Sequence, residues 1–275
     1  MIKRTLLALL FCNLLASSLV AAEVSPWISP PWECQGGLGY GFEHFEHVQS
    51  PAGSFRTVQN THHFRGSFGM TVWPRVNVEG ELVLAKNSLF NFAFEALYLS
   101  GRYVLCDDQR GDFATVTAGT SLTFAGGQVL RNLSFAYHGY ANVEFNVALG
   151  KEFGGTCCQQ WQWRLWSYFG YGIAERGSPW IRSIISLDQE LTSCIDASLF
   201  VQMLYGLGHN NIIAAQPFPG YASIGHQAVD LGLNFSYGLG PIGSFDLLGW
   251  INLHARDFPQ HALGFSAQLR IPFSL

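Results

Sequence analysis

Alternation of apolar and polar residues is the feature that most constrains this chain. From Leu133 to Leu149 every second residue is apolar or glycine, and serine, histidine, asparagine and glutamate lie between them. A period of two is typical of a β-strand with one apolar face. The same pattern recurs over 90–98, 161–173, 229–237 and 263–275. Many strands with a single apolar face predict a closed sheet that contacts lipid.

The first residues have the organisation of a secretory signal peptide. Lys3 and Arg4 precede an apolar run, which ends in small residues at Ala22. This order is that of a signal peptide, which is removed from the mature chain. We therefore assign residues 1–22 to the signal and expect one domain over residues 23–275.

Composition excludes two other classes of protein. Charged residues make up 12% of the chain, against roughly 25% in ordinary soluble domains. A transmembrane helix needs about 18 uninterrupted apolar residues, and no such stretch follows the predicted signal peptide. The 15 basic residues are outnumbered by 19 acidic ones, for a formal net charge of −4, which argues against nucleic acid as a partner.

Two all-β architectures fit such alternation: a secreted soluble sandwich and a membrane barrel. The polar face decides between them. A sandwich exposes that face to water and carries many lysines and carboxylates there, whereas this chain places mostly amides, hydroxyls, glycines and rings at those positions. The fold we predict is all-β: a transmembrane antiparallel β-barrel of the bacterial outer membrane, in contact with membrane lipid.

We predict about 12 strands, with 10 or 14 as alternatives because the region around Pro179 and 188–192 is ambiguous. The predicted strands span 36–47, 63–73, 76–86, 89–104, 113–124, 132–149, 160–174, 180–189, 194–206, 225–238, 244–256 and 261–275. With both termini in the periplasm, the longest outward connections are 48–62 and 207–224.

Cysteine placement indicates covalent links in the envelope. Cys12 leaves with the signal, and the other cysteines fall at the start of the first strand or on inward connections. They are Cys34, Cys106, Cys157, Cys158 and Cys194. Because the periplasm is oxidising, we expect disulfides within the barrel or to other envelope proteins. Buried, reduced thiols are the alternative.

The segment Pro31, Trp32, Glu33 and Cys34 leads into a glycine-rich first strand, and the other cysteines lie on predicted periplasmic turns. In this layout the chain resembles the cysteine-bearing major outer-membrane porins of chlamydia-type bacteria. The resemblance implies a passive porin that forms oligomers, including homo-oligomers, and is cross-linked by disulfides.

We predict no enzymatic activity, because the motif of a barrel phospholipase is missing from the sequence. A barrel phospholipase would need His and Ser two residues apart on one strand face, and no His-x-Ser occurs. Histidines and glutamates cluster near the first outward connection, at Glu43, His44, Glu46, His47, His62 and His63. Because they divide between two strand faces, we predict neither a metal site nor a cofactor.

Charged residues at inward positions indicate the function. Both signs occur there, and we select five candidates for the lumen: Glu81, Glu95, Glu144, Arg164 and Arg256. We predict a narrow diffusion channel for small hydrophilic solutes or ions, with cations favoured by the acidic excess. The alternative is a non-conducting structural or surface-adhesion barrel, linked to envelope partners by disulfides, whose outward loops bind a partner.

Overall fold

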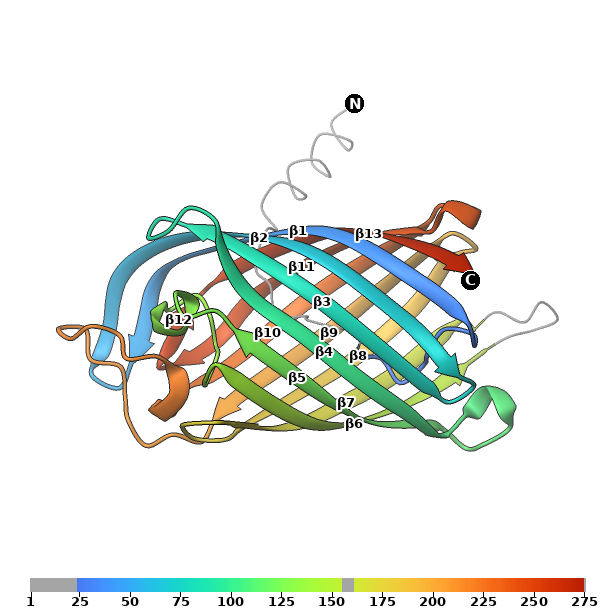
Figure 1. The fold of residues 1–275 in the computed structure, drawn as a ribbon, viewed down its shortest axis with the longest axis horizontal. Coiled ribbons are helices and arrows are strands. Elements are labelled where there is room, and N and C mark those ends of the chain that lie inside the picture. Colours follow the sequence, from blue (N-terminus) through green and yellow to red (C-terminus); the bar gives the residue numbers. More distant parts are fainter. Residues whose placement is uncertain (1–23, 155–160, 275) are drawn as a thin grey trace, which may run out of the picture.

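A single antiparallel sheet closes on itself to form a barrel (Figure 1). The structure is a computed structural model that describes residues 24–154 and 161–274, so the predicted signal peptide lies outside the described residues. Closure occurs at β1 (Glu33–Ser50), which pairs with β2 (Gly53–Trp73) on one side and with β13 (Leu263–Ser274) on the other.

The remaining strands follow one another around the barrel in chain order. They are β3 (Val76–Asn87), β4 (Ala93–Cys106), β5 (Thr115–Ala125), β6 (Ala141–Phe153), β7 (Trp163–Ala174), β8 (Trp180–Thr192), β9 (Ile195–Gly206), β10 (Gln227–Gly238) and β11 (Ser244–Arg256). Together with β1, β2 and β13 these make a wall of 12 strands, and β12 (Phe258–Gln260) is a short strand paired with the end of β1. The prediction of an all-β barrel with 12 strands is confirmed.

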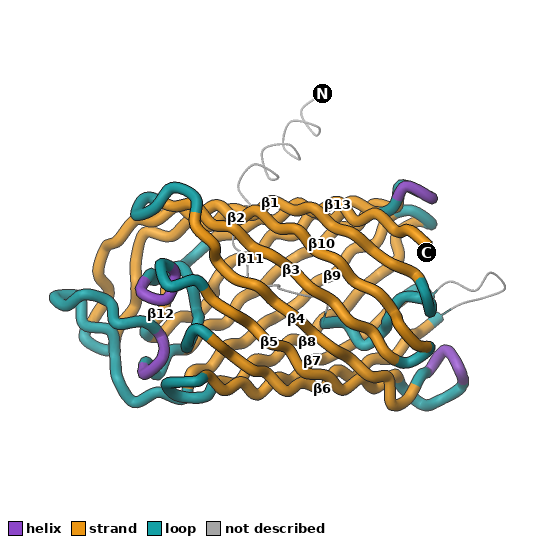
Figure 2. Tube along the Cα trace, in the orientation of Figure 1, coloured by secondary structure: helices purple, strands orange, loops and turns teal. Residues whose placement is uncertain are grey.

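The two ends of the barrel differ. One end, which we call the turn end, carries the C-terminus and mostly short connections, among them 74–75, 193–194 and 239–243 (Figure 1). The opposite loop end carries the longer connections 126–140 and 207–226. Figure 2 shows the strands tilted between these ends, with the irregular segments gathered at both of them.

Outward-facing residues form an apolar surface. In β6 the side chains of Phe145, Val147 and Leu149 are 53%, 40% and 49% exposed, whereas Glu144 and Ala148 on the inner face are buried. This is the pattern expected of a barrel with lipid outside and polar groups within. Among the described residues, no helix has the length and hydropathy needed to cross a bilayer.

The predicted strand over 132–149 is wrong in its first half. β6 begins only at Ala141, and the connection 126–140 folds inward, so that Phe135 packs near Tyr137 and Phe90 with ring centroids 6.5 and 6.1 Å apart. An apolar side chain is removed from water both when it packs against other side chains inside the lumen and when it faces lipid. Alternation alone therefore did not distinguish this inward loop from a strand.

A β-bulge reverses the alternation predicted over 90–98. Leu84 pairs with Phe94 and Val83 pairs with Ala96, so Glu95 is an extra residue in β4. Phe94 is exposed on the outer face, but Ala96 is fully buried and Tyr98 lines the lumen. A shift of one residue exchanges the two faces of a strand, so the expectation that Ala96 and Tyr98 face lipid is wrong.

The predicted outward loop 48–62 is instead a continuation of the first hairpin. Ser50 pairs with Gly53, and Pro51 and Ala52 form the turn. Gly53 has a φ of 123°, which glycine adopts without steric cost. Of the two predicted long outward connections, only the one over 207–224 is irregular, and it spans 207–226 in the structure.

Candidate functional site in the barrel lumen

A cavity of about 130 Å³ lies inside the barrel. One of its walls carries Glu43 and Glu95, from β1 and β4, and the other carries Glu144 and Arg182, from β6 and β8. Aromatic side chains complete the lining: Tyr98, Phe135, Tyr137, Trp180, Trp250 and Phe258. A cavity with several rings and a few converging polar groups is a typical small-molecule site.

Glu144 is the centre of one hydrogen-bonded cluster. Arg182 donates to its Oε1 over 2.7 Å, Trp180 donates from Nε1 to Oε2 over 3.1 Å, and Tyr168 also donates to this carboxylate. The Trp180 ring lies against Gly172, where a Cβ atom would be 1.9 Å from the ring. Glycine at this position therefore allows the indole to reach Glu144.

Glu95 is the centre of a second cluster. Its Oε2 lies 2.6 Å from Nδ1 of His63, and its Oε1 accepts a hydrogen bond of 2.8 Å from the Tyr137 hydroxyl. On the other side of the imidazole, Glu43 Oε2 lies 3.9 Å from His63 Nε2. Two buried carboxylates therefore share one histidine.

A second cavity, of about 80 Å³, lies alongside residues of β1, β2, β3 and β13. Glu81 and Tyr98 line both cavities, so the two spaces adjoin at these side chains. Ion pairs flank the second cavity, with Arg102 2.6 Å from Glu79 and Arg270 2.9 Å from Asp246. Polar space therefore runs along the β3–β4 wall of the lumen.

Residues 25–27, before the first strand, occupy part of the turn-end half of the lumen. Arg102 donates to the Ser25 carbonyl over 2.7 Å, and Thr117 donates to the Pro26 carbonyl over 2.6 Å. The guanidinium of Arg164 lies over the Trp27 ring, 4.6 Å from its centroid. These contacts hold the segment against the inner wall and narrow the lumen.

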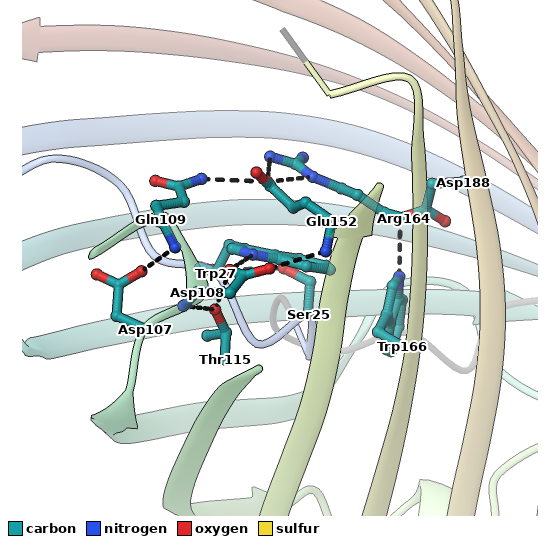
Figure 3. A network of polar contacts seen from close by, with 10 residues as sticks. All are labelled: Ser25, Trp27, Asp107, Asp108, Gln109, Thr115, Glu152, Arg164, Trp166 and Asp188. Carbon is teal, nitrogen blue, oxygen red and sulfur yellow. Dashed lines mark hydrogen bonds and ion pairs between the residues drawn. The ribbon is translucent and has the colours of Figure 1, made fainter. Parts of the chain in front are cut away.

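Asp108 anchors Trp27 at the turn end (Figure 3). Its carboxylate accepts hydrogen bonds from Trp27 Nε1 at 3.3 Å, from Thr115 Oγ1 at 2.5 Å and from the Glu152 N–H at 2.8 Å. Partial burial raises the pKa of Asp108, but these bonds together outweigh it and lower the pKa below its usual value. The carboxylate therefore stays ionised, as a fixed negative charge beside the N-terminal segment.

Connections at the loop end fold over the lumen. The Tyr221 hydroxyl donates to the Leu133 carbonyl over 2.9 Å and so ties 207–226 to 126–140. The ring of His138 lies 4.5 Å from that of Trp180 and 5.0 Å from that of His226. Burial lowers the pKa of His138 to about 4, and burial together with His138 lowers the pKa of His226 to about 3.

The five predicted lumen residues lie in three places. Glu81, Glu95 and Glu144 line the larger cavity, while Arg164 lies beside Trp27 and bonds to Glu152 over 2.8 Å. Arg256 lies at the loop end of β11, where its side chain is 53% exposed and its Nε is 4.0 Å from Asp257.

Sequence reasoning did not identify Tyr137 or Trp27 as lumen residues. Tyr137 had the parity of a lipid-facing residue within a predicted strand. For Trp27 a signal was present, because residues 24–32 contain two tryptophans and three prolines. Such an apolar segment, next to the first strand, is poorly suited to extend into water.

Three of the predicted cysteines lie at the turn end, in agreement with the prediction that they share one side. Cys34 is buried, Cys106 and Cys194 are exposed, and these three are free thiols. Cys157 and Cys158 lie outside the described residues. The predicted disulfides are therefore not seen in the described part of the chain, where the described His, Cys, Asp and Glu side chains also form no metal-binding group of three or more.

Solved structures share this fold. An outer-membrane channel from Pseudomonas putida F1 matches with a TM-score of 0.67 at 9% identity, over 93% of this chain and 100% of that chain. A NanC porin matches with a TM-score of 0.54 at 9% identity, over 87% of this chain and 100% of that one. A KdgM porin matches with a TM-score of 0.50 at 9% identity, over 86% and 99%.

These likenesses show the fold, which is that of bacterial outer-membrane β-barrels. They lend no support to the predicted resemblance to chlamydia-type porins. No protein-family model matches the sequence, and no curated protein matches it.

Proposed function

We propose that the protein is an outer-membrane channel through which small hydrophilic solutes or ions diffuse. The observation that carries this proposal is the pair of adjoining cavities inside a closed wall, with Glu81 and Tyr98 common to both. A barrel whose interior served only as packing would fill that space with side chains, as small barrels do. The shared fold with an outer-membrane channel supports the same conclusion.

The lumen favours small solutes. Residues 25–27 narrow its turn-end half, and the connections 126–140 and 207–226 cover its loop end. Carboxylates of the larger cavity outnumber its arginines, since Glu43, Glu81, Glu95 and Glu144 face Arg65 and Arg182. An excess of one charge raises the local concentration of the opposite ion, so we expect a preference for cations.

The proposed location is the bacterial outer membrane, with the apolar outer face in contact with lipid. Residues 1–22 would direct export as a signal peptide and leave residues 23–275 as a single domain. Barrels of this type place short turns in the periplasm and longer loops outside the cell. The turn end would accordingly lie in the periplasm.

Single-channel recording in a planar bilayer tests the proposal. We expect steady conductance steps from the wild-type protein and larger steps from Trp27→Ala, because the substitution removes a ring from the lumen. Trp73→Ala is the matched control: this tryptophan is at the same end of the barrel but exposed, so its loss should leave conductance unchanged. A folded barrel that stays silent in both wild-type and Trp27→Ala forms would refute a channel.

One observation favours a second candidate function, a non-conducting surface barrel. A cluster of buried apolar side chains occupies the loop end, including Phe45, Tyr221, Ile224 and Phe258. If this cluster never opens, the connection 207–226 would serve to bind a partner outside the cell. Silence in the bilayer, with a normally folded barrel, is the result expected of this candidate.

A further inference from the structure

The cluster formed by Glu43, His63 and Glu95 places two carboxyl groups against one imidazole. Both carboxylates flank one imidazole, at 3.9 Å and 2.6 Å. All three residues are more than nine-tenths buried, with 6%, 1% and 6% of their surface exposed. Two buried carboxyl groups so close together disfavour each other's ionised form, and a cation bound between them would favour it.

The arginines of the same cavity lie near several carboxyl groups. Arg182 is 2.7 Å from Glu144, whereas Arg65 is 4.0 Å from Glu81 and also interacts electrostatically with Glu95. Among the described residues that line the cavity, these two arginines and His63 are the cationic or titratable basic groups. The four carboxyl groups that line the cavity therefore outnumber its two arginines, and a cation entering the cavity would find carboxyl groups to pair with.

Aromatic rings border the cluster. The Phe135 ring centroid lies 5.8 Å from that of His63, and Tyr137 donates its hydroxyl to Glu95. Tyr98 lies next to Tyr137, with ring centroids 6.4 Å apart. The negative faces of such rings attract ammonium groups, and the attraction is stronger where water is excluded.

The cavity also presents hydrogen-bond acceptors. Asn142 Oδ1 is buried and accepts no hydrogen bond from the described part of the chain. Glu81 Oε1 is also buried, and Arg65 Nε, at 4.0 Å, is too far away to donate a hydrogen bond to it. Both residues line the cavity. An acceptor buried without a donor is costly, and a solute that carries N–H or O–H groups would satisfy it.

We propose that this cavity is a binding site for a small organic cation, an alkylammonium compound, held between the Glu43–His63–Glu95 cluster and the rings of Phe135, Tyr137 and Tyr98. The inference rests on the proposed channel function and deepens it, because it names the class of solute that pauses in the lumen. Anions are excluded by the carboxylates, and an uncharged analogue of the same shape would bind weakly for lack of the ionic contact.

Isothermal titration of the purified full-length barrel with choline tests this site. Dimethylbutanol, in which carbon replaces the ammonium nitrogen, is the matched uncharged probe. We expect saturable choline binding, no saturable binding of dimethylbutanol, and at least about tenfold weaker choline binding by Glu43→Gln. Glu46→Gln, on the same strand but half exposed, should bind choline as the wild-type protein does.

A second variant covers the case in which Glu43→Gln fails to fold. Tyr137→Leu removes a ring from the inward connection 126–140, which is not part of the strand wall that closes the barrel. This variant should also weaken choline binding about tenfold. Equal binding of choline and dimethylbutanol, or unchanged binding by the folded variants, would overturn the proposal. Isothermal titration does not depend on ion flow, so the two proposals can fail separately. A barrel that binds choline but is silent in bilayers contradicts only the proposed channel function. A barrel that conducts but does not bind choline contradicts only the proposed binding site.

Discussion

Glu144 and Arg182 form the most enclosed ion pair of the β6–β8 wall, with 9% and 13% of their side chains exposed. Removing one member of such a pair leaves a charge without a partner and costs about 3–5 kcal/mol, whereas removing both costs far less. The Coulomb attraction within the pair is offset by the desolvation of both groups. The pair therefore adds little net stability, but each member prevents the other from being a buried charge without a partner.

We expect Glu144→Gln to lower the free energy of unfolding by about 3 kcal/mol. The double variant that also carries Arg182→Gln should be destabilised by less than the sum of the single changes. Urea unfolding in detergent, followed by tryptophan fluorescence, measures both effects, because Trp180 donates to Glu144.

The exposed pair Glu46–Arg56, with 3.9 Å between charged atoms, is the control. Its Glu46→Gln variant should change stability by less than about 0.5 kcal/mol, as is usual for surface ion pairs. A Glu144→Gln barrel as stable as the wild type would contradict our account of this pair.

Residue parity placed Glu95 and Glu144 on the inner face correctly, but it contained no information about their partners. His63 reaches Glu95 from β2 and Arg182 reaches Glu144 from β8. Which residues meet depends on the register between strands and on how far each side chain extends. Neither quantity is encoded in the spacing along one strand.

Three connections at the loop end pack through two histidines. His138 in 126–140 bonds through Nδ1 to the Ser178 carbonyl over 3.0 Å, and its ring contacts that of His226. Burial lowers the pKa of His138 to about 4, and burial together with His138 lowers the pKa of His226 to about 3. Both imidazoles are therefore neutral at pH 7. Protonation would place a charge between packed rings.

The sign of the pH effect follows from these lowered pKa values. Unfolded histidine binds a proton near its ordinary pKa of 6.5, and the folded loops bind it only at lower pH. The loop packing is therefore fully stable above about pH 6.5 and weakens as the pH falls toward 4. The intrinsic rate of amide exchange itself falls with pH in this range, so the quantity to measure is the protection relative to that rate. We expect the protection of backbone amides in 126–140 to decrease over that interval.

The variants His138→Phe and His226→Phe keep a ring and remove the titration, so each should reduce the loss of protection at low pH. The control is His209→Phe, because His209 is exposed in the connection 207–226 and its replacement should leave the pH dependence of protection intact. Protection factors that are independent of pH in the wild-type protein would show that these histidines do not govern the loops.

Individual elements show where the alternation pattern failed. In β4, the extra residue Glu95 reverses the two faces, so Ala96 and Tyr98 point inward. In 126–140, an apolar alternation belongs to a loop that packs inside the lumen. A pattern of period two indicates an extended backbone, but it does not show which side chains face lipid and which face the lumen. A bulge exchanges the two faces, and an inward loop carries the pattern without belonging to the wall.

At the scale of the whole molecule, the orientation of the barrel in the membrane can be tested through its cysteines. Cys106 and Cys194 are exposed at the turn end, which we assign to the periplasm. In a chain that keeps only Cys194, a membrane-impermeant maleimide should label the protein only after the outer membrane has been permeabilised.

The matched variant carries Ala52→Cys as its single cysteine, in the turn between β1 and β2 at the loop end. It should be labelled in intact cells. Labelling of Cys194 in intact cells, with Ala52→Cys protected, would mean that the barrel is inserted in the opposite orientation.

The sequence by itself determined the class of fold and a strand number of about 12, and it placed Glu95 and Glu144 on the inner face. These properties depend on a local period of two and on composition, because lipid outside and a polar interior must act on every strand alike. Only the tertiary structure decided what fills the lumen. Trp27 meets Arg164 and Tyr137 meets Glu95 because closure of the barrel brings distant segments into one enclosed space, where charge pairing and burial select the partners.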